Sequence, residues 1–207
     1  MRKYRITGLI LVALLFNNAS GFGQTNDLSN DDIEEFKARA GRMIDGFQAN
    51  LGKIASKEVA EAIKQGHVRT TLESFIGEGD YYNDEEEGRD KIVQMEVSSL
   101  YREPRKRKIT LKSYLTSLAR LPYAKVEITS AETPRISNFY KQGDRYVATA
   151  TIAQRFCGFK RIEGRLVKTY CDTTKKTFKV YLFKEMDMFG ELWVVKLGDA
   201  TVDDTTP

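Results

Sequence analysis

The chain has 207 residues, of which 33 are Lys or Arg and 29 are Asp or Glu. This length suits one domain with at most a small appendage. A charged content of 30% and a mean hydropathy of -0.44 exclude a bundle of transmembrane helices, and 41% hydrophobic residues exclude a disordered, low-complexity chain. Residues 1–23 hold three basic residues and no acid, which leaves 30 basic and 29 acidic side chains in the remainder. This balance does not favour a nucleic-acid partner.

Residues 1–23 have the order of a secretory signal peptide. A cationic start, residues 1–5, precedes an apolar run over residues 6–16 and a small, polar segment over residues 17–23. The apolar run is too short to span a bilayer, which needs roughly 20 residues in a helix. We therefore predict cleavage after Gly23, or alternatively after Gly21, and export to the periplasm or the outside of the cell. An uncleaved membrane anchor is the competing interpretation.

The chain has only two cysteines, Cys157 and Cys171. Export would place them where disulfides persist, and we predict that they form an intramolecular disulfide at the base of a basic hairpin insertion. A metal site is the alternative, but two thiols and one distant His supply too few ligands. We expect neither a metal nor a cofactor.

The first half of the chain has helical periodicity. We expect residues 24–56 to form an N-terminal helical arm, because Ser29 begins a Ser-x-x-Asp cap and apolar residues then recur at spacings of three and four. Two short helices, residues 57–65 and 68–76, should follow, separated at Gly66 because the apolar stripe changes face there. The acidic residues 77–90 and the basic residues 102–108 are expected to be loops; the acidic segment lacks the residue spacing of a calcium loop.

The second half changes to the period of strands. A strand over residues 91–99 and a helix from Thr110 to Leu121 precede four alternating segments. We expect these four strands to cover residues 125–132, 145–156, 177–184 and 192–202. Helices followed by strands indicate an α+β fold with an antiparallel sheet, a main domain over residues 57–203 and a short tail over residues 204–207.

The order of elements resembles the nuclear transport factor 2-like superfamily, which includes SnoaL-like and ketosteroid isomerase-like proteins. Three stretches carry the resemblance: residues 62–67 leading to Ile76, residues 113–121, and residues 142–147. His67 departs from the Asp or Asn that commonly follows the glycine in the first stretch. The resemblance implies a cone-shaped, strongly curved antiparallel sheet around a hydrophobic pocket, and often a dimer formed through the sheet. It does not fix the function, because this fold supports many.

Strand alternation predicts a sheet that is apolar on both faces. The helix-covered face should carry seven residues: Tyr146, Ala148, Ala150, Ile152, Phe178, Val180 and Leu182. The opposite face then receives Tyr181 and Phe183, and the last strand adds further apolar side chains. Exposed apolar patches of this kind usually meet a partner, so we expect a homodimer or a partner interface, with the N-terminal helix as the rival cover.

Three residues are weak candidates for a pocket: Tyr146 and Trp193, which could stack on a ligand, and His67, the only His. No catalytic residue can be assigned. We expect an exported, non-enzymatic binding or assembly module for a small hydrophobic ligand or a protein partner. The alternative is an isomerase, dehydratase or cyclase of the SnoaL-like kind that uses a carboxylate in the cone pocket. A buried carboxylate with a raised pKa that faces a Tyr hydroxyl would favour the enzyme.

Overall fold

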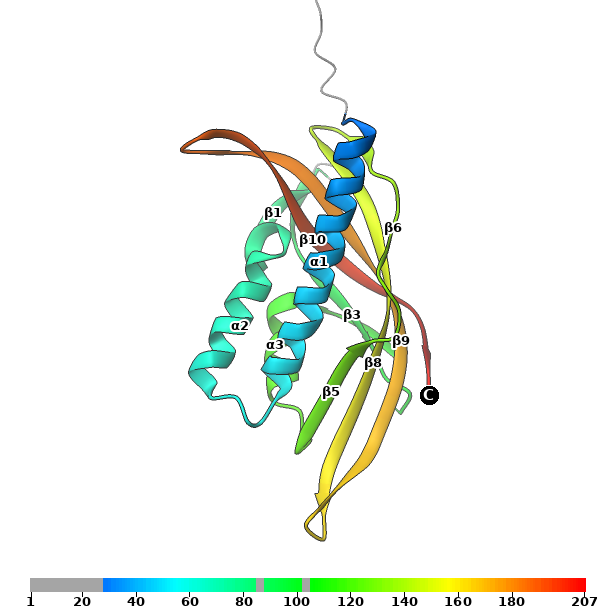
Figure 1. Ribbon diagram of the computed structural model, residues 1–207. Coiled ribbons are helices and arrows are strands. Elements are labelled where there is room, and N and C mark those ends of the chain that lie inside the picture. Colours follow the sequence, from blue (N-terminus) through cyan, green and yellow to red (C-terminus); the bar gives the residue numbers. More distant parts are fainter. Residues whose placement is uncertain (1–27, 85–87, 102–104) are drawn as a thin grey trace, which may run out of the picture.

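The computed structural model in Figure 1 describes residues 28–84, 88–101 and 105–207. The leader expected in residues 1–23 lies outside these residues, as do parts of the two expected loops. The helical elements are α1 (Asn30–Ala55), α2 (Glu61–Glu73), the short 3-10 helix η1 (Ile76–Gly79) and α3 (Leu111–Ala119). The strands are β1 (Tyr81–Asp84), β2 (Arg89–Ile92), β3 (Gln94–Ser98), β4 (Lys106–Thr110), β5 (Lys125–Ser130), β6 (Arg135–Ile136), β7 (Tyr140–Gln142), β8 (Arg145–Ile162), β9 (Arg165–Asp187) and β10 (Gly190–Thr206).

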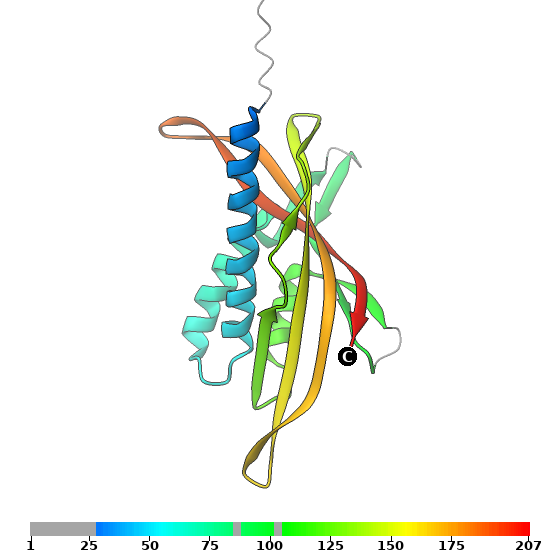
Figure 2. The ribbon, with the colours of Figure 1, turned by 45° about the vertical axis from the view of Figure 1, so that its right-hand side comes forward.

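The fold is α+β, as the order of periodicities predicts. The main sheet has the order β4-β3-β10-β9-β8-β5, and the short strands β6 and β7 also pair with β8. The sheet is mixed, whereas the sequence indicated an antiparallel one, because β3 and β10 pair in parallel. That pairing is possible because α3 and the central strands form the long connection that a parallel pair requires. Figure 2 shows that the long strands cross the molecule as an open, twisted sheet.

The long strands extend well beyond the segments predicted for them. β8 has 18 residues, β9 has 23 and β10 has 17, and β10 includes the expected tail up to Thr206. The added segments lack apolar alternation, and hydrogen bonds to the neighbouring strand extend the ladder through them. β4 likewise begins at Lys106, inside the segment expected as a basic loop.

Helix α1 lies along the inner face of the sheet (Figures 1 and 2). It begins with the predicted capping box, in which the Ser29 side chain accepts a hydrogen bond from the backbone N–H of Asp32. The ring of Phe47 lies 5.4 Å from Phe75 and 5.5 Å from Phe178. The residues expected as a separate arm therefore supply one wall of the common core. None of the helices within the described residues combines the length and the apolar character needed to cross a membrane.

The helix-covered face of β8 and β9 is the predicted one. All seven residues assigned to it are buried: Tyr146, Ala148, Ala150, Ile152, Phe178, Val180 and Leu182. Ala150 pairs directly with Phe178, so both side chains lie on one face of the sheet. Every second residue of β8 and β9 in either direction lies on the same face.

Helix α2 runs without interruption through Gly66, so the predicted break at this glycine is wrong. Within α2 only Lys64 and Thr71 are buried. A helix that lies mostly at the surface does not need one continuous apolar stripe, and this is why the change of face does not break it.

The acidic segment expected as a loop forms η1 and the hairpin β1–β2, which covers part of the outer face of the sheet. Tyr82 packs edge-on against Tyr181, with ring centroids 6.4 Å apart. Lys91 Nζ lies 3.1 Å from Asp84 Oδ2 and 3.6 Å from Asp199 Oδ2. Tyr181 is only 3% exposed. The outer face is therefore covered here by a third element, and not by α1.

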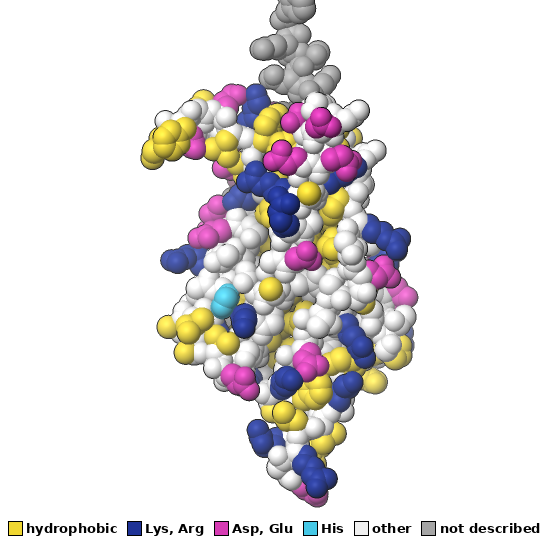
Figure 3. Space-filling model, in the orientation of Figure 1, with side chains coloured by type: hydrophobic (Ala, Val, Ile, Leu, Met, Phe, Trp, Pro, Cys, Tyr) yellow, Lys and Arg dark blue, Asp and Glu magenta, His cyan; other side chains and the backbone are white. Residues whose placement is uncertain are grey.

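The hairpin end between β9 and β10 carries exposed hydrophobic side chains. Met186, Met188 and Phe189 are between 74% and 90% exposed, and hydrophobic atoms project from this end in Figure 3. These three side chains are therefore not folded back onto the sheet edge.

Candidate functional site

The inner face of β8 and β9 changes from apolar to polar along the strands. Three further inward-facing pairs follow the pair formed by Ala150 and Phe178. They are Ile152 with Lys176, Gln154 with Thr174, and Phe156 with Asp172. These residues continue the same face by strand alternation. Polar side chains thus lie inside the molecule, on the part of the inner face that is opposite α3 and not α1.

A cavity of about 460 Å³ lies between α3 and the sheet. Its lining residues come from α3 and the segment after it, from β3, β4 and the residues next to them, and from β8 and β9: Val97, Ser98, Ser99, Arg105, Arg107, Ile109, Tyr114, Ser117, Leu118, Leu121, Tyr123, Gln154, Phe156, Tyr170, Asp172, Thr174 and Lys176. This volume and the mixture of apolar walls with a few polar groups are typical of small-molecule sites.

Lys176 is a buried ammonium in this cavity, with 6% of the residue exposed. Its Nζ donates a hydrogen bond to Gln154 Oε1 at 2.7 Å and lies 5.6 Å from the centre of the Tyr114 ring. Burial lowers the pKa of Lys176 to about 8, although the nearby Asp172 opposes the shift. A charge held away from water is costly, so its presence here requires an explanation beyond packing.

Gln154 has one polar atom without a partner. The residue is 5% exposed, and its Nε2 is buried and makes no hydrogen bond within residues 28–84, 88–101 and 105–207. The orientation of the amide is fixed, because the group that meets the ammonium of Lys176 must be the acceptor oxygen. A buried donor left unpaired costs about 1–3 kcal/mol. A second polar group at the cavity therefore lacks a partner among the residues that the structure describes.

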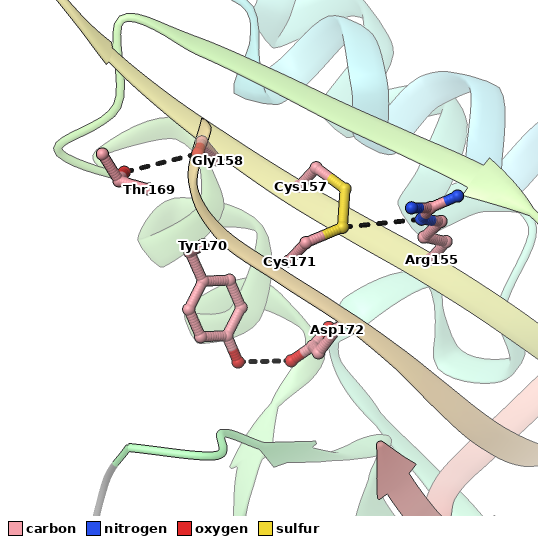
Figure 4. Close-up of a disulfide and its surroundings, with 7 residues drawn as sticks. All are labelled: Arg155, Cys157, Gly158, Thr169, Tyr170, Cys171 and Asp172. Atoms are coloured by element: carbon pink, nitrogen blue, oxygen red, sulfur yellow. Dashed lines mark hydrogen bonds between the residues drawn. A yellow bond between two sulfur atoms is a disulfide. The ribbon is translucent and has the colours of Figure 1, made fainter. Parts of the chain in front are cut away.

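Asp172 and Tyr170 form the third polar feature of the cavity. The Tyr170 hydroxyl donates a hydrogen bond to the Asp172 carboxylate (Figure 4). Burial raises the pKa of Asp172, and the hydrogen bond from Tyr170 and the charge of Lys176 oppose this shift. Burial, and then the same hydrogen bond, raises the pKa of Tyr170 to about 12. The pKa of the Asp172 carboxyl group is thus closer to neutral than that of an exposed carboxyl group. The Tyr170 phenol stays protonated at neutral pH.

The aromatic wall of the cavity depends on one glycine. Tyr123 packs edge-on against Phe156, with ring centroids 6.0 Å apart. The Tyr123 ring also lies directly against the backbone of Gly158, where an added Cβ would be 2.5 Å from the ring. Glycine is therefore required at this position for Tyr123 to close the wall.

The three residues that the sequence suggested for a pocket lie outside this cavity. Tyr146 and Trp193 pack against each other with ring centroids 5.8 Å apart, and Trp193 also meets Phe36 of α1 at 6.2 Å. His67 Nδ1 lies 2.9 Å from Asn50 Oδ1, which ties α2 to α1. None of the three candidates is among the residues that line the cavity.

Sequence reasoning missed the polar residues of the cavity. Lys176, Thr174 and Asp172 continue the inward alternation of β9 past Phe178. The signal was therefore present in the sequence as a set of polar residues at inward positions. It was not used because the strand was expected to begin at residue 177.

Cys157 and Cys171 form the predicted disulfide, on the other side of β9 from Tyr170 and Asp172 (Figure 4). The two residues are direct partners in the β8–β9 ladder, and Arg155 Nε donates to Cys171 Sγ at 3.5 Å. The bridge therefore lies within two continuous strands and not at the base of an insertion. It is consistent with an oxidising, exported location.

No group of three or more His, Cys, Asp or Glu side chains within the described residues is arranged to hold a metal ion. The comparisons with known proteins add no neighbour: no family model, no curated protein and no solved structure matches the chain.

Proposed function

We propose that the protein is an exported binding protein that holds a small amphipathic molecule in the cavity between α3 and the sheet. The observation that carries this proposal is the pair of buried polar groups in that cavity, the Lys176 ammonium and the unpaired Nε2 of Gln154. Asp172 offsets only part of the cost of burying this charge, and an unpaired donor beside it adds a further cost. A bound molecule with acceptor atoms would compensate both.

Binding should be tested on the purified protein with a thermal-shift screen of small amphipathic molecules, followed by calorimetry on those that stabilise it. Ser117 of α3 is exposed and lines the cavity, so Ser117→Trp should fill it and abolish binding. Its neighbour Thr116 is exposed but does not line the cavity, so Thr116→Trp is the matched control. Equal binding by both variants would contradict the proposal.

A second candidate function is acid–base catalysis by Asp172. Its raised pKa and its hydrogen bond from Tyr170 are the arrangement that favours an enzyme over a passive binding module. In this hypothesis Asp172 would remove a proton from a carbon next to a carbonyl of the substrate and return it to another atom of the same substrate. Lys176 would stabilise the negative charge that develops on the carbonyl oxygen.

The catalytic reading is tested by hydrogen exchange from bound ketones into deuterated water, followed by mass spectrometry. Exchange that Asp172→Asn abolishes while binding persists would support an enzyme. Binding without any exchange would leave the binding module.

The nuclear transport factor 2-like resemblance belongs to the same proposal. The order of three helices and a large sheet supports it, and so does the position of the cavity between a helix and the sheet. Export is supported by the pattern of residues 1–23 and by the disulfide. Intact-mass measurement of the protein from its native host should give a chain that begins near Gln24. A membrane-bound form that retains the first 23 residues would contradict export by cleavage.

A further inference from the structure

We infer that the ligand is an organic acid whose carboxylate accepts hydrogen bonds from Lys176 and Gln154 and whose hydrophobic body packs along α3. This inference rests on the proposed binding function and names the class of ligand for that site.

The two donors lie side by side on the inner face of the sheet. Lys176 and Thr174 are successive inward residues of β9, and Thr174 pairs directly with Gln154 of β8. An ammonium has three N–H bonds, and one of them goes to Gln154 Oε1. The Nε2 of Gln154 donates no hydrogen bond to any of the described residues. A carboxylate only accepts hydrogen bonds and has two oxygens, so one such group can serve both donors.

The charges around the cavity favour an anion over a cation or a neutral molecule. Three of its charged residues are cations, Lys176, Arg105 and Arg107, and one is a carboxylate, Asp172. Asp172 already accepts the hydrogen bond of Tyr170. A cationic ligand would be repelled by the Lys176 ammonium, and a neutral alcohol would not offset the cost of burial that remains despite the nearby Asp172.

The remaining walls suit a hydrophobic body. Tyr114, Leu118 and Leu121 line the cavity from the α3 side, and Phe156 and Tyr123 line it from the sheet side. Lys176 and Gln154 are buried, whereas Arg105 and Arg107 are exposed. The acid group of the ligand therefore lies at the buried end of the cavity, beside the sheet.

Three probes with the same hydrophobic body test the inference: phenylbutyrate, phenylbutanol and phenylbutylamine, each titrated into the purified protein by calorimetry. The acid should bind at least about tenfold more tightly than the alcohol, and the amine should bind most weakly.

Lys176→Met should remove the advantage of the acid over the alcohol, and Gln154→Leu should reduce it. Lys175→Met is the matched control, because Lys175 is the adjacent residue on the opposite face, with 59% of its side chain exposed. It removes the same charge without touching the cavity and should keep the preference for the acid. Circular dichroism establishes that each variant is folded before its affinities are compared.

The affinity for phenylbutyrate should also depend on pH. Burial lowers the pKa of Lys176 to about 8, so its charge is lost from the free protein above that pH and the acid should bind progressively more weakly. The other charged or titratable groups that face the cavity are Asp172, Tyr114, Tyr123, Tyr170, Arg105 and Arg107. The alcohol should show no such decline, and neither should the acid with Lys176→Met.

The possible outcomes separate the two proposals. Equal affinities for the acid, the alcohol and the amine would overturn the inference about the carboxylate and leave the binding function standing. A preference for the acid that survives Lys176→Met and Gln154→Leu would also overturn it. Failure of all three probes to bind would overturn the inference and count against the binding function together.

Discussion

Cys157 and Cys171 face each other as direct partners in the β8–β9 ladder, with Cα atoms 4.1 Å apart. The ladder already brings the two residues together, so the disulfide clamps a pairing that exists without it. The bridged residues are 14 positions apart, a loop length for which the chain-entropy model gives about 3 kcal/mol.

The double variant Cys157→Ala, Cys171→Ala should therefore stay folded, with a free energy of unfolding lower by at most about 3 kcal/mol. Amide hydrogen exchange should accelerate mainly in residues 158–170, because most of this hairpin end is exposed and has no core of its own. Chemical denaturation and exchange mass spectrometry measure the two effects. Loss of the sheet signal, or faster exchange spread evenly through β8 and β9, would contradict the prediction.

Lys176 should make stability depend on pH in the alkaline range. Its pKa is lowered by burial from 10.5 to about 8 in the folded state. At a pH between these values the folded protein has released this proton and the unfolded chain has not. The unfolded state then binds more protons, so this residue makes the free energy of unfolding rise with pH across that window.

Lys176→Met removes this contribution. Between pH 8 and 10.5 the wild-type protein should gain stability relative to the variant, by up to about 1.4 kcal/mol per pH unit. Urea titrations at several pH values measure the difference. Lys175→Met, which changes an exposed lysine, serves as the control and should follow the wild type. Parallel pH profiles for the wild type and Lys176→Met would show that the lysine is not buried as a charge.

Gly158→Ala should push Tyr123 out of the cavity wall. The new Cβ would be 2.5 Å from the Tyr123 ring, a collision that the ring can relieve only by moving. Overpacking of this kind costs about 1–3 kcal/mol. Chemical denaturation should show the loss of stability, and ligand binding in the cavity should weaken with it. A variant with wild-type stability and wild-type binding would contradict the packing of Tyr123 on Gly158.

Gly66→Ala should stabilise the protein, in contrast to Gly158→Ala. An added Cβ at Gly66 meets nothing within 4 Å, and the residue lies inside the continuous helix α2. Replacing glycine by alanine in a helix interior stabilises by about 0.5–1 kcal/mol. Thermal denaturation of the single variant measures the effect. A lower melting temperature would instead indicate the helix break that the sequence pattern suggested.

Self-association is proposed through the part of the outer face that β1–β2 leaves accessible. Leu192 is 37% exposed there and Phe183 is half-buried, next to the bare hairpin end of β9 and β10. We expect a dimer at micromolar concentration by light scattering, and Leu192→Glu should convert it to a monomer. Leu166→Glu, at an exposed leucine of the distant hairpin end, is the control and should leave the dimer intact. A monomeric wild-type protein would refute this interface.

The sequence by itself determined the parts of this protein that depend on neighbours along the chain. The Ser29 cap, the apolar faces of α1 and α3, and the inward alternation from Tyr146 to Ile152 are local patterns, and each follows from the period of a helix or a strand. The two cysteines could be paired because no other cysteine competes for either of them.

Only the tertiary structure decided the site and the cover of the outer face. Lys176 and Gln154 are 22 residues apart, and the register of the β8–β9 ladder, not either local pattern, brings them into contact. Tyr82 reaches Tyr181 from the segment that looked like an acidic loop. The alternation of a strand says which residues share a face, but which element covers that face depends on contacts between distant segments. The sequence therefore indicated the α+β class, while the cavity and its buried charge emerged only from the packed chain.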